Sequence, residues 1–173
     1  ALASLLFIFP SLFGEGYQSI KTLALQQPEN LLDNGLFQNY KSNGWFVLIF
    51  VGVLIFVKAI ATALTLGSGG NGGNFAPSLF VGSYLGFFLS RCLNMLHLTN
   101  LPESNFTIVG MAGILSGLYH APLTAIFLIA EITGGYTLMI PLMIVSSISY
   151  AISKYFEPFS MDTKILGQSG KIF

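Results

Sequence analysis

The sequence predicts an all-α integral membrane protein, a helical bundle with broken and re-entrant helices. Over 173 residues, 53% are hydrophobic and only 8% are charged, whereas a soluble domain is nearer a quarter charged. The mean hydropathy is +0.73. Apolar runs long enough for helices recur along the chain, and Gly or Pro interrupts some of them. A span needs about 20 apolar residues, so the chain has room for a few spans and some shorter pieces.

Charge and cysteine content exclude several classes of protein. Seven Lys and Arg balance seven Asp and Glu, which leaves no net field to attract nucleic acid. Cys92 is the single cysteine, so it cannot form an intrachain disulfide and is expected to pack in the core or face lipid. No cofactor or metal site is expected.

The first 44 residues predict little regular structure. Residues 1–13 are apolar and end at a Gly-Glu-Gly break, which favours the end of a helix there. The chain begins without Met or a basic leading segment, so it does not resemble a signal peptide. We expect a fragment of a longer membrane protein. Residues 14–44 form the most polar stretch and predict short helices and a loop at the water interface.

The first transmembrane helix is predicted over residues 45–66, which are apolar apart from Lys58. Trp45 is placed like an interfacial anchor. Lys58 and Arg91 lie near the ends of apolar runs. Long basic side chains at such positions extend to the interface, so both are expected to do so.

A glycine-rich loop follows at residues 67–77, before a second apolar run at 78–89. Pro suits the first turn of a helix, because its missing N–H would have no intrahelical partner there. Pro77 is therefore expected to open a helix whose first free amides belong to Asn74, Phe75 and Ala76. At membrane depth, irregular backbone is tolerated only where it is buried in protein or lines a cavity. The loop is a candidate site.

The second half of the chain predicts a broken helix and one more span. A loop is expected at residues 97–105, then an apolar segment at 107–119 that breaks at 120–122 and resumes through Ile129. Each half is too short to cross a membrane alone, a pattern typical of transporters with discontinuous helices. Residues 136–155 are long enough to span, with Pro141 in the first two turns.

The tail at residues 154–173 carries three lysines, which favours a cytoplasmic C-terminus.

Free backbone N–H groups at the start of the predicted helix would make an anion site without any formal positive charge. Such a site can hold an anion weakly enough to release it, as conduction requires. The alternative interpretation is a flexible interhelical turn, which composition alone favours equally. A phosphate-binding loop is excluded, because no strand precedes the glycines and no Lys follows them.

Two other interpretations concern single polar residues. Ser68 is flanked by glycines and could be the nucleophile of an intramembrane hydrolase with His97 or His120. We favour this less, since His97 falls in a loop and His120 sits at a helix break that suits a structural role. Glu131 ends an apolar run, where a carboxylate is either functional or at the interface.

The motifs resemble those of the CLC family of chloride channels and chloride/proton antiporters. The run GNFAP at 73–77 is similar to the family's GxFxP motif. The runs GMAG at 110–113, APLT at 121–124 and EIT at 131–133 resemble its next helices. The order and spacing match from about residue 10 to residue 166. The resemblance implies a CLC-type inverted-repeat bundle, with residues 1–173 as the second repeat, the C-terminal half of the membrane domain.

The resemblance also implies an anion site. The family's two central GxFxP amides correspond here to Asn74 and Phe75, with Gly73 and Ala76 as neighbours. The family's SxYxxxL pattern supplies a Tyr hydroxyl to the anion, but SMDTKIL at 160–166 places Asp162 at that position. An ionised carboxylate would repel a bound anion, so our hypothesis is that Asp162 does not bind it directly. The serine loop and gating glutamate of the family's N-terminal half do not occur in this sequence.

The implied function is transmembrane chloride transport, as an antiporter or a channel, and not an enzymatic activity. The implied partners are chloride, protons, the lipid bilayer and a second copy of the chain. The homodimer would have one pathway in each subunit and an interface formed by residues 107–155, in a multi-pass protein of the cell membrane. The alternatives are the Ser68 hydrolase and an assembly subunit without transport function.

Overall fold

The computed structural model describes residues 17–24, 44–70, 72–134 and 136–164. These residues form helices and no strand, which confirms the predicted all-α fold. The helices are α2 (Tyr17–Ala24), α3 (Gly44–Gly67), α4 (Phe75–Met95), α5 (Glu103–Tyr119), α6 (Pro122–Ile132) and α7 (Met139–Phe156). Within the polar 14–44 stretch, α2 is a short helix as predicted. The helix end expected in residues 1–13 lies outside the described residues.

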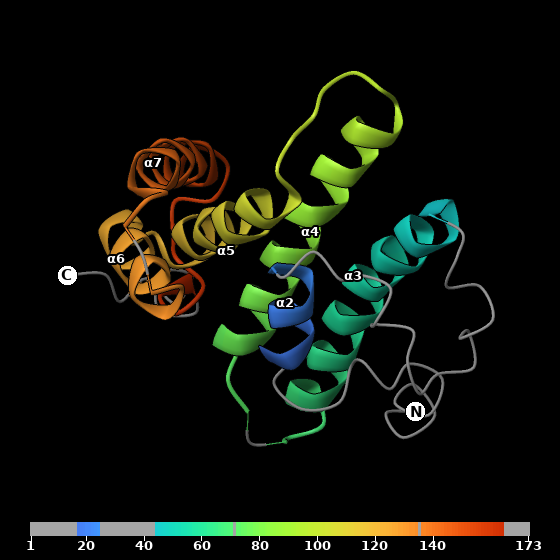
Figure 1. The fold of residues 1–173 in the computed structure, drawn as a ribbon. Helices are drawn as coiled ribbons and strands as arrows, with labels where there is room; N and C mark the ends of the chain where they lie inside the picture. The colour runs from blue at the N-terminus through green and yellow to red at the C-terminus, as the bar shows by residue number, and fades with distance from the viewer. Residues whose placement is uncertain (1–16, 25–43, 71, 135, 165–173) are drawn as a thin grey trace.

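Two described helices, α3 and α7, are long and apolar enough to cross a membrane, and α6 is a shorter apolar helix. The α3 bounds confirm the span predicted over 45–66. In Figure 1, α3 and α4 run side by side and are joined at one end by the glycine-rich loop, while α6 and α7 gather around the far end of α5.

Glycines bring α4 and α5 into close contact. A Cβ on Gly82 would lie 2.7 Å from the Gly110 carbonyl oxygen, and a Cβ on Gly86 would collide with the Phe106 carbonyl oxygen. Small residues at a crossing let two backbones approach closely. The chain reverses between α4 and α5, so the last residue of α5, Tyr119, lies beside the first residue of α4, Phe75.

Serine hydroxyls join α5 to α7. Three of them donate hydrogen bonds to carbonyl oxygens of the facing helix, a contact common between helices in membranes. The pairs are Ser116 to Ser146 at 2.6 Å, Ser149 to Gly113 at 2.7 Å and Ser153 to Gly117 at 2.6 Å. This serine seam holds the broken α5–α6 unit against α7.

Lys58 corrects one expectation, because its side chain is buried at 6% exposure and does not reach the interface. It follows Val51, Leu54 and Ile55 on the face of α3 that packs into the protein. Its Nζ lies 5.0 Å from the centroid of the Phe80 ring on α4. A cation over an aromatic face is attracted by the ring quadrupole, so the ring stabilises the ammonium inside the bundle.

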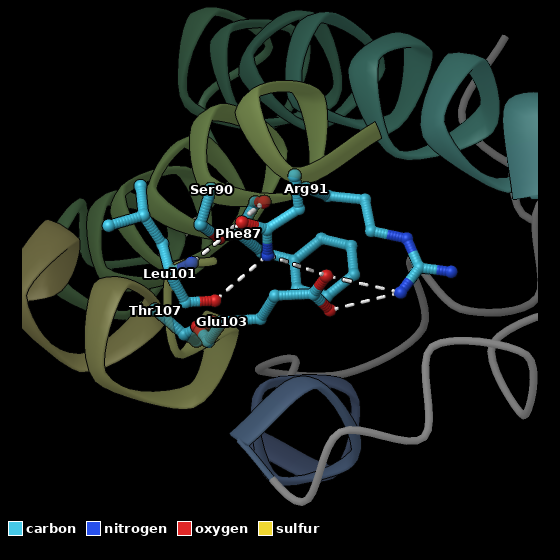
Figure 2. A network of polar contacts seen from close by, with 7 residues as sticks. Phe87, Ser90, Arg91, Leu101, Glu103 and Thr107 are labelled. Carbon is cyan, nitrogen blue, oxygen red and sulfur yellow. Dashed lines mark hydrogen bonds and ion pairs between the residues drawn. The ribbon is translucent and has the colours of Figure 1, made fainter. Parts of the chain in front are cut away.

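Arg91, also expected to reach the interface, forms an ion pair within the protein. Its guanidinium lies 3.1 Å from the Glu103 carboxylate at the start of α5. The Asn94 side chain donates to the Leu101 carbonyl at 2.8 Å and accepts from the Leu101 N–H at 2.7 Å. These four residues, which we call the clasp, close the connection between α4 and α5, as Figure 2 shows for the Arg91 and Glu103 pair.

Several predicted boundaries shift by a few residues. The second apolar helix continues past residue 89 to Met95, and α5 begins at Glu103, so the predicted 97–105 loop is shorter. The predicted break at 120–122 is confirmed, with His120 at a left-handed φ of 54°. Pro141 is the third residue of α7, within the first turn, where a missing N–H costs no helical hydrogen bond.

Candidate anion site at the start of helix α4

Helix α4 begins where the sequence predicts, two residues before Pro77. Its first residue is Phe75 and its N-cap is Asn74. The first helical hydrogen bond runs from the Ser78 N–H to the Asn74 carbonyl at 3.0 Å. The amides of Phe75 and Ala76 therefore precede the helical ladder, as expected for the first turn of any helix.

The glycine-rich loop that leads to α4 starts by ending α3. Gly69 has a φ of 82°, a left-handed conformation that commonly ends a helix. The Gly70 N–H donates to the Thr65 carbonyl at 3.0 Å, and a Cβ at Gly70 would lie 2.6 Å from that oxygen. Gly73 has open space around it. The backbone between α3 and α4 thus turns tightly at 69–70 and is open just before the helix.

Two small apolar cavities flank the start of α4. One, of about 330 Å³, is lined by α3, α4, α5 and Met161, and both Asn74 and Ser78 contact it. The other, of about 240 Å³, is lined by Phe75, Tyr119 and residues of α5 and α6. Low-polarity surroundings strengthen the interaction of a helix end with a charge. The first turn of α4 lies in such surroundings.

The polar side chains at this end of α4 carry hydroxyl groups. The Ser78 hydroxyl donates to the Phe75 carbonyl at 2.7 Å, and the Tyr119 ring lies 6.4 Å from the Phe75 ring, measured between centroids. Among the described segments, the Arg91–Glu103 ion pair lies at the other end of α4 and the Lys164–Glu157 pair lies around the turn after α7. No cluster of three or more metal-ligating side chains occurs in those segments. The groups present can donate hydrogen bonds to an anion without adding a full charge.

Asp162, predicted at the position of the family's Tyr, is an exposed residue in the turn after α7. The Met161 N–H donates to the Leu118 carbonyl at 3.1 Å, which attaches this turn to the end of α5. The Asp162 carboxylate acts electrostatically on the Tyr119 hydroxyl. The structure thus brings Asp162 to the same end of the bundle as Asn74 and Phe75, with an exposed side chain.

The residues of the hydrolase alternative are not brought together. The Ser68 hydroxyl donates to the Thr65 carbonyl at 3.0 Å. The His120 ring packs edge-on against Tyr150 with 5.9 Å between centroids, which fits its predicted structural role. In the described part of the chain, Ser68 makes no hydrogen bond with either histidine.

Glu131 is exposed at the end of α6 and accepts a 3.4 Å hydrogen bond from the Tyr136 hydroxyl. This arrangement matches the interfacial interpretation of its carboxylate.

Sequence reasoning missed Tyr119. The tyrosine precedes the His-Ala-Pro break directly, and a hydroxyl at such a break was the signal available. Its position beside Phe75 follows from the α4–α5 crossing, which the sequence pattern does not show.

Comparison with known proteins agrees with the motifs. The family model described as voltage gated chloride channel matches residues 1–154. The voltage-gated ClC-type chloride channel ClcB of Salmonella dublin is 30% identical over 150 residues, which cover 84% of this chain and 31% of that protein. The H(+)/Cl(-) exchange transporter ClcA of Vibrio cholerae is 33% identical over 143 residues, covering 82% of this chain and 27% of that protein.

A shorter match with higher identity is the H(+)/Cl(-) exchange transporter ClcA of Vibrio campbellii, 39% identical over 102 residues, or 58% of this chain and 20% of that protein. The chain thus spans a third or less of each of these relatives. The match over most of its length, together with the all-helical fold and the apolar helices, identifies it as a membrane protein of the voltage-gated chloride channel (CLC) family.

Proposed function

We propose that residues 1–173 are the second inverted repeat, the C-terminal half, of a CLC membrane domain that transports chloride across the membrane. The full-length protein works either as a chloride/proton antiporter or as a chloride channel. Relatives bearing both kinds of name support this range of activities.

The observation that carries the proposal is the start of α4. The amides of Phe75 and Ala76 precede the first helical hydrogen bond, and small apolar cavities lie on either side. A partly dehydrated chloride would accept hydrogen bonds from the Asn74 and Phe75 amides and interact with the helix dipole. Gly73 and Ala76 border the site, and the Phe75 ring narrows the path.

Asp162 has no direct contact with the anion in this proposal. Its side chain is exposed, and water screens an exposed charge strongly. The carboxylate therefore turns to solvent at a wet end of the path.

The proposed assembly is a homodimer with α5, α6 and α7 at the interface. Large apolar side chains of α6 and α7 stay exposed in the single chain, which supports a covered face; they include Leu123, Phe127, Ile140, Ile144 and Ile148. Lys154 lies in the last turn of the last span and Lys164 follows it, which favours a cytoplasmic C-terminus.

The full-length protein in liposomes tests the transport proposal. With a chloride gradient imposed, chloride and proton movements are recorded together. Chloride flux that drives protons uphill identifies an antiporter, and chloride flux without protons identifies a channel or an uncoupled carrier. Absence of chloride flux contradicts the proposal.

The role of the α4 start is tested with a matched pair of variants. Pro77 and Pro141 are each the third residue of a helix. Pro77→Gly should loosen the start of α4 and weaken chloride binding, measured by isothermal titration calorimetry. Pro141→Gly makes the same chemical change at the start of α7 and should leave the chloride affinity unchanged. Equal affinities for the wild type and Pro77→Gly would exclude this loop as the anion site.

A further inference from the structure

Tyr119 lies beside the proposed anion site although no motif marks it. It is the last residue of α5, and its ring centroid lies 6.4 Å from that of Phe75, the first residue of α4. The two rings line the same cavity of about 240 Å³. The Tyr119 side chain is partly buried. A phenol that carries a hydroxyl is therefore held against the turn whose amides precede the helical ladder.

The hydrogen bonds at this turn leave the Tyr119 proton available. The Ser78 hydroxyl donates its only proton to the Phe75 carbonyl at 2.7 Å. It therefore has no second proton to donate to the Tyr119 hydroxyl. Rotation about the phenol C–O bond can turn the Tyr119 O–H towards an anion bound at this turn. Hydrogen bonds to an ionised acceptor are about twice as strong as neutral ones. A bound chloride would therefore be the preferred acceptor of the hydrogen bond from Tyr119.

Asp162 cannot supply this donor. An ionised carboxylate only accepts hydrogen bonds, and this one is exposed. The backbone bond from Met161 to Leu118 holds its turn next to the last residues of α5, so the Asp162 carboxylate acts on Tyr119. The chain thus has an acid where the family pattern has a tyrosine, and a tyrosine from another helix beside that acid.

We infer that the Tyr119 hydroxyl donates a hydrogen bond to the chloride bound at the start of α4, and so supplies the phenol that the 160–166 segment lacks. This inference rests on the proposed function of that site. It adds one side-chain ligand from α5 to the backbone amides of α4.

Chloride titration of the full-length protein tests the inference. Tyr119→Phe removes one oxygen and keeps the ring against Phe75, so the fold should be retained. Loss of a hydrogen bond to a charged partner should weaken chloride binding roughly tenfold. Tyr155→Phe is the matched control, since Tyr155 is 84% exposed at the end of α7, and it should bind chloride like the wild type.

A stronger donor provides a readout that a packing role would not change. Replacing Tyr119 with 3-fluorotyrosine makes the phenol more acidic and a better hydrogen-bond donor. At a pH where the phenol keeps its proton, chloride binding should tighten relative to the wild type. A side chain that only fills space would not produce tighter binding from one fluorine atom together with weaker binding from the loss of the hydroxyl.

The outcomes separate this inference from the proposed function. Wild-type affinity in Tyr119→Phe, with weakened binding in Pro77→Gly, overturns the role of Tyr119 and leaves the α4 site standing. Wild-type protein that does not bind chloride overturns both. Weaker binding in Tyr119→Phe alone, with unchanged binding in Tyr155→Phe and tighter binding with 3-fluorotyrosine, supports the inference.

Discussion

The two ends of α4 differ in the charge of the polar groups that they carry. At the C-terminal end, the clasp neutralises full charges, with Arg91 3.1 Å from Glu103. At the N-terminal end, the cavities on either side are apolar, and the polar groups beside them include backbone amides and the Ser78 hydroxyl. Both ends belong to one helix and both pack against α5. The difference therefore comes from the side chains at each end and not from the architecture.

The contrast has a physical reason. Unpaired charges are costly within an apolar membrane domain, so a charge used for packing needs a partner, and the clasp provides one. A transported anion must bind and leave again. Neutral donors and a helix dipole bind it without the strong attraction of a fixed cation. The C-terminal end of α4 is held to α5 by the clasp, whereas the N-terminal end can bind and release an anion.

The largest effect is expected from a substitution that forces α4 away from α5. Gly86→Ala places a Cβ against the Phe106 carbonyl oxygen, which is backbone and cannot move alone. The free energy of unfolding in detergent micelles should fall by about 3 kcal/mol. Gly67→Ala is the control, because its Cβ meets nothing within 4 Å. Equal unfolding free energies for the two variants would contradict the close crossing.

The next largest effect is expected from removing the Asn94 side-chain amide of the clasp. Asn94→Ala leaves both the N–H and the carbonyl of Leu101 without the Asn94 side chain, and should reduce the free energy of unfolding by about 2 kcal/mol. Asn100→Ala removes an exposed amide from the same connection and should change little. The chloride affinity should be unchanged in both variants. A weakened affinity in Asn94→Ala would show that the two ends of α4 are coupled.

A smaller effect is expected from the ion pair of the clasp. Glu103→Gln keeps the shape of a half-buried partner of Arg91 and removes its charge, at a cost of about 1 kcal/mol in unfolding free energy. Glu157→Gln does the same to the exposed pair with Lys164, whose side chains are 45% and 46% exposed, and should cost at most about 0.5 kcal/mol. Chemical denaturation measures both. A larger loss of unfolding free energy in Glu157→Gln than in Glu103→Gln would contradict the expectation that the more buried pair contributes more.

The smallest effect is expected from the exposed carboxylate near the N-terminal end of α4. Asp162→Asn removes an exposed charge near Tyr119, so the chloride affinity should change by less than about fivefold. Anion flux and its pH dependence should stay as in the wild type, measured in liposomes beside Glu157→Gln. A large change in either quantity would show that the carboxylate takes part in binding the anion.

Local patterns predicted most elements of the fold. The span at 45–66, the helix start near Pro77 and the break at 120–122 depend on hydropathy, on proline and on glycine, which act within a few residues. The GNFAP run placed the candidate amides at the start of α4, where the structure has them. Helix ends were less accurate, as at Met95 and Glu103, because apolar periodicity fades before a helix ends.

Hydropathy and local motifs are enough to predict an apolar, helical membrane protein with a glycine-rich turn before a helix that has Pro77 in its first turn. The packing of Lys58 over Phe80, the hydrogen bond from Ser149 to Gly113 and the contact of Tyr119 with Phe75 depend on the tertiary structure. Each of these contacts joins residues more than a dozen positions apart on different helices. A local pattern sets which residues are helical, whereas the crossing of two helices sets which side chains meet, and close glycine contacts fix that crossing.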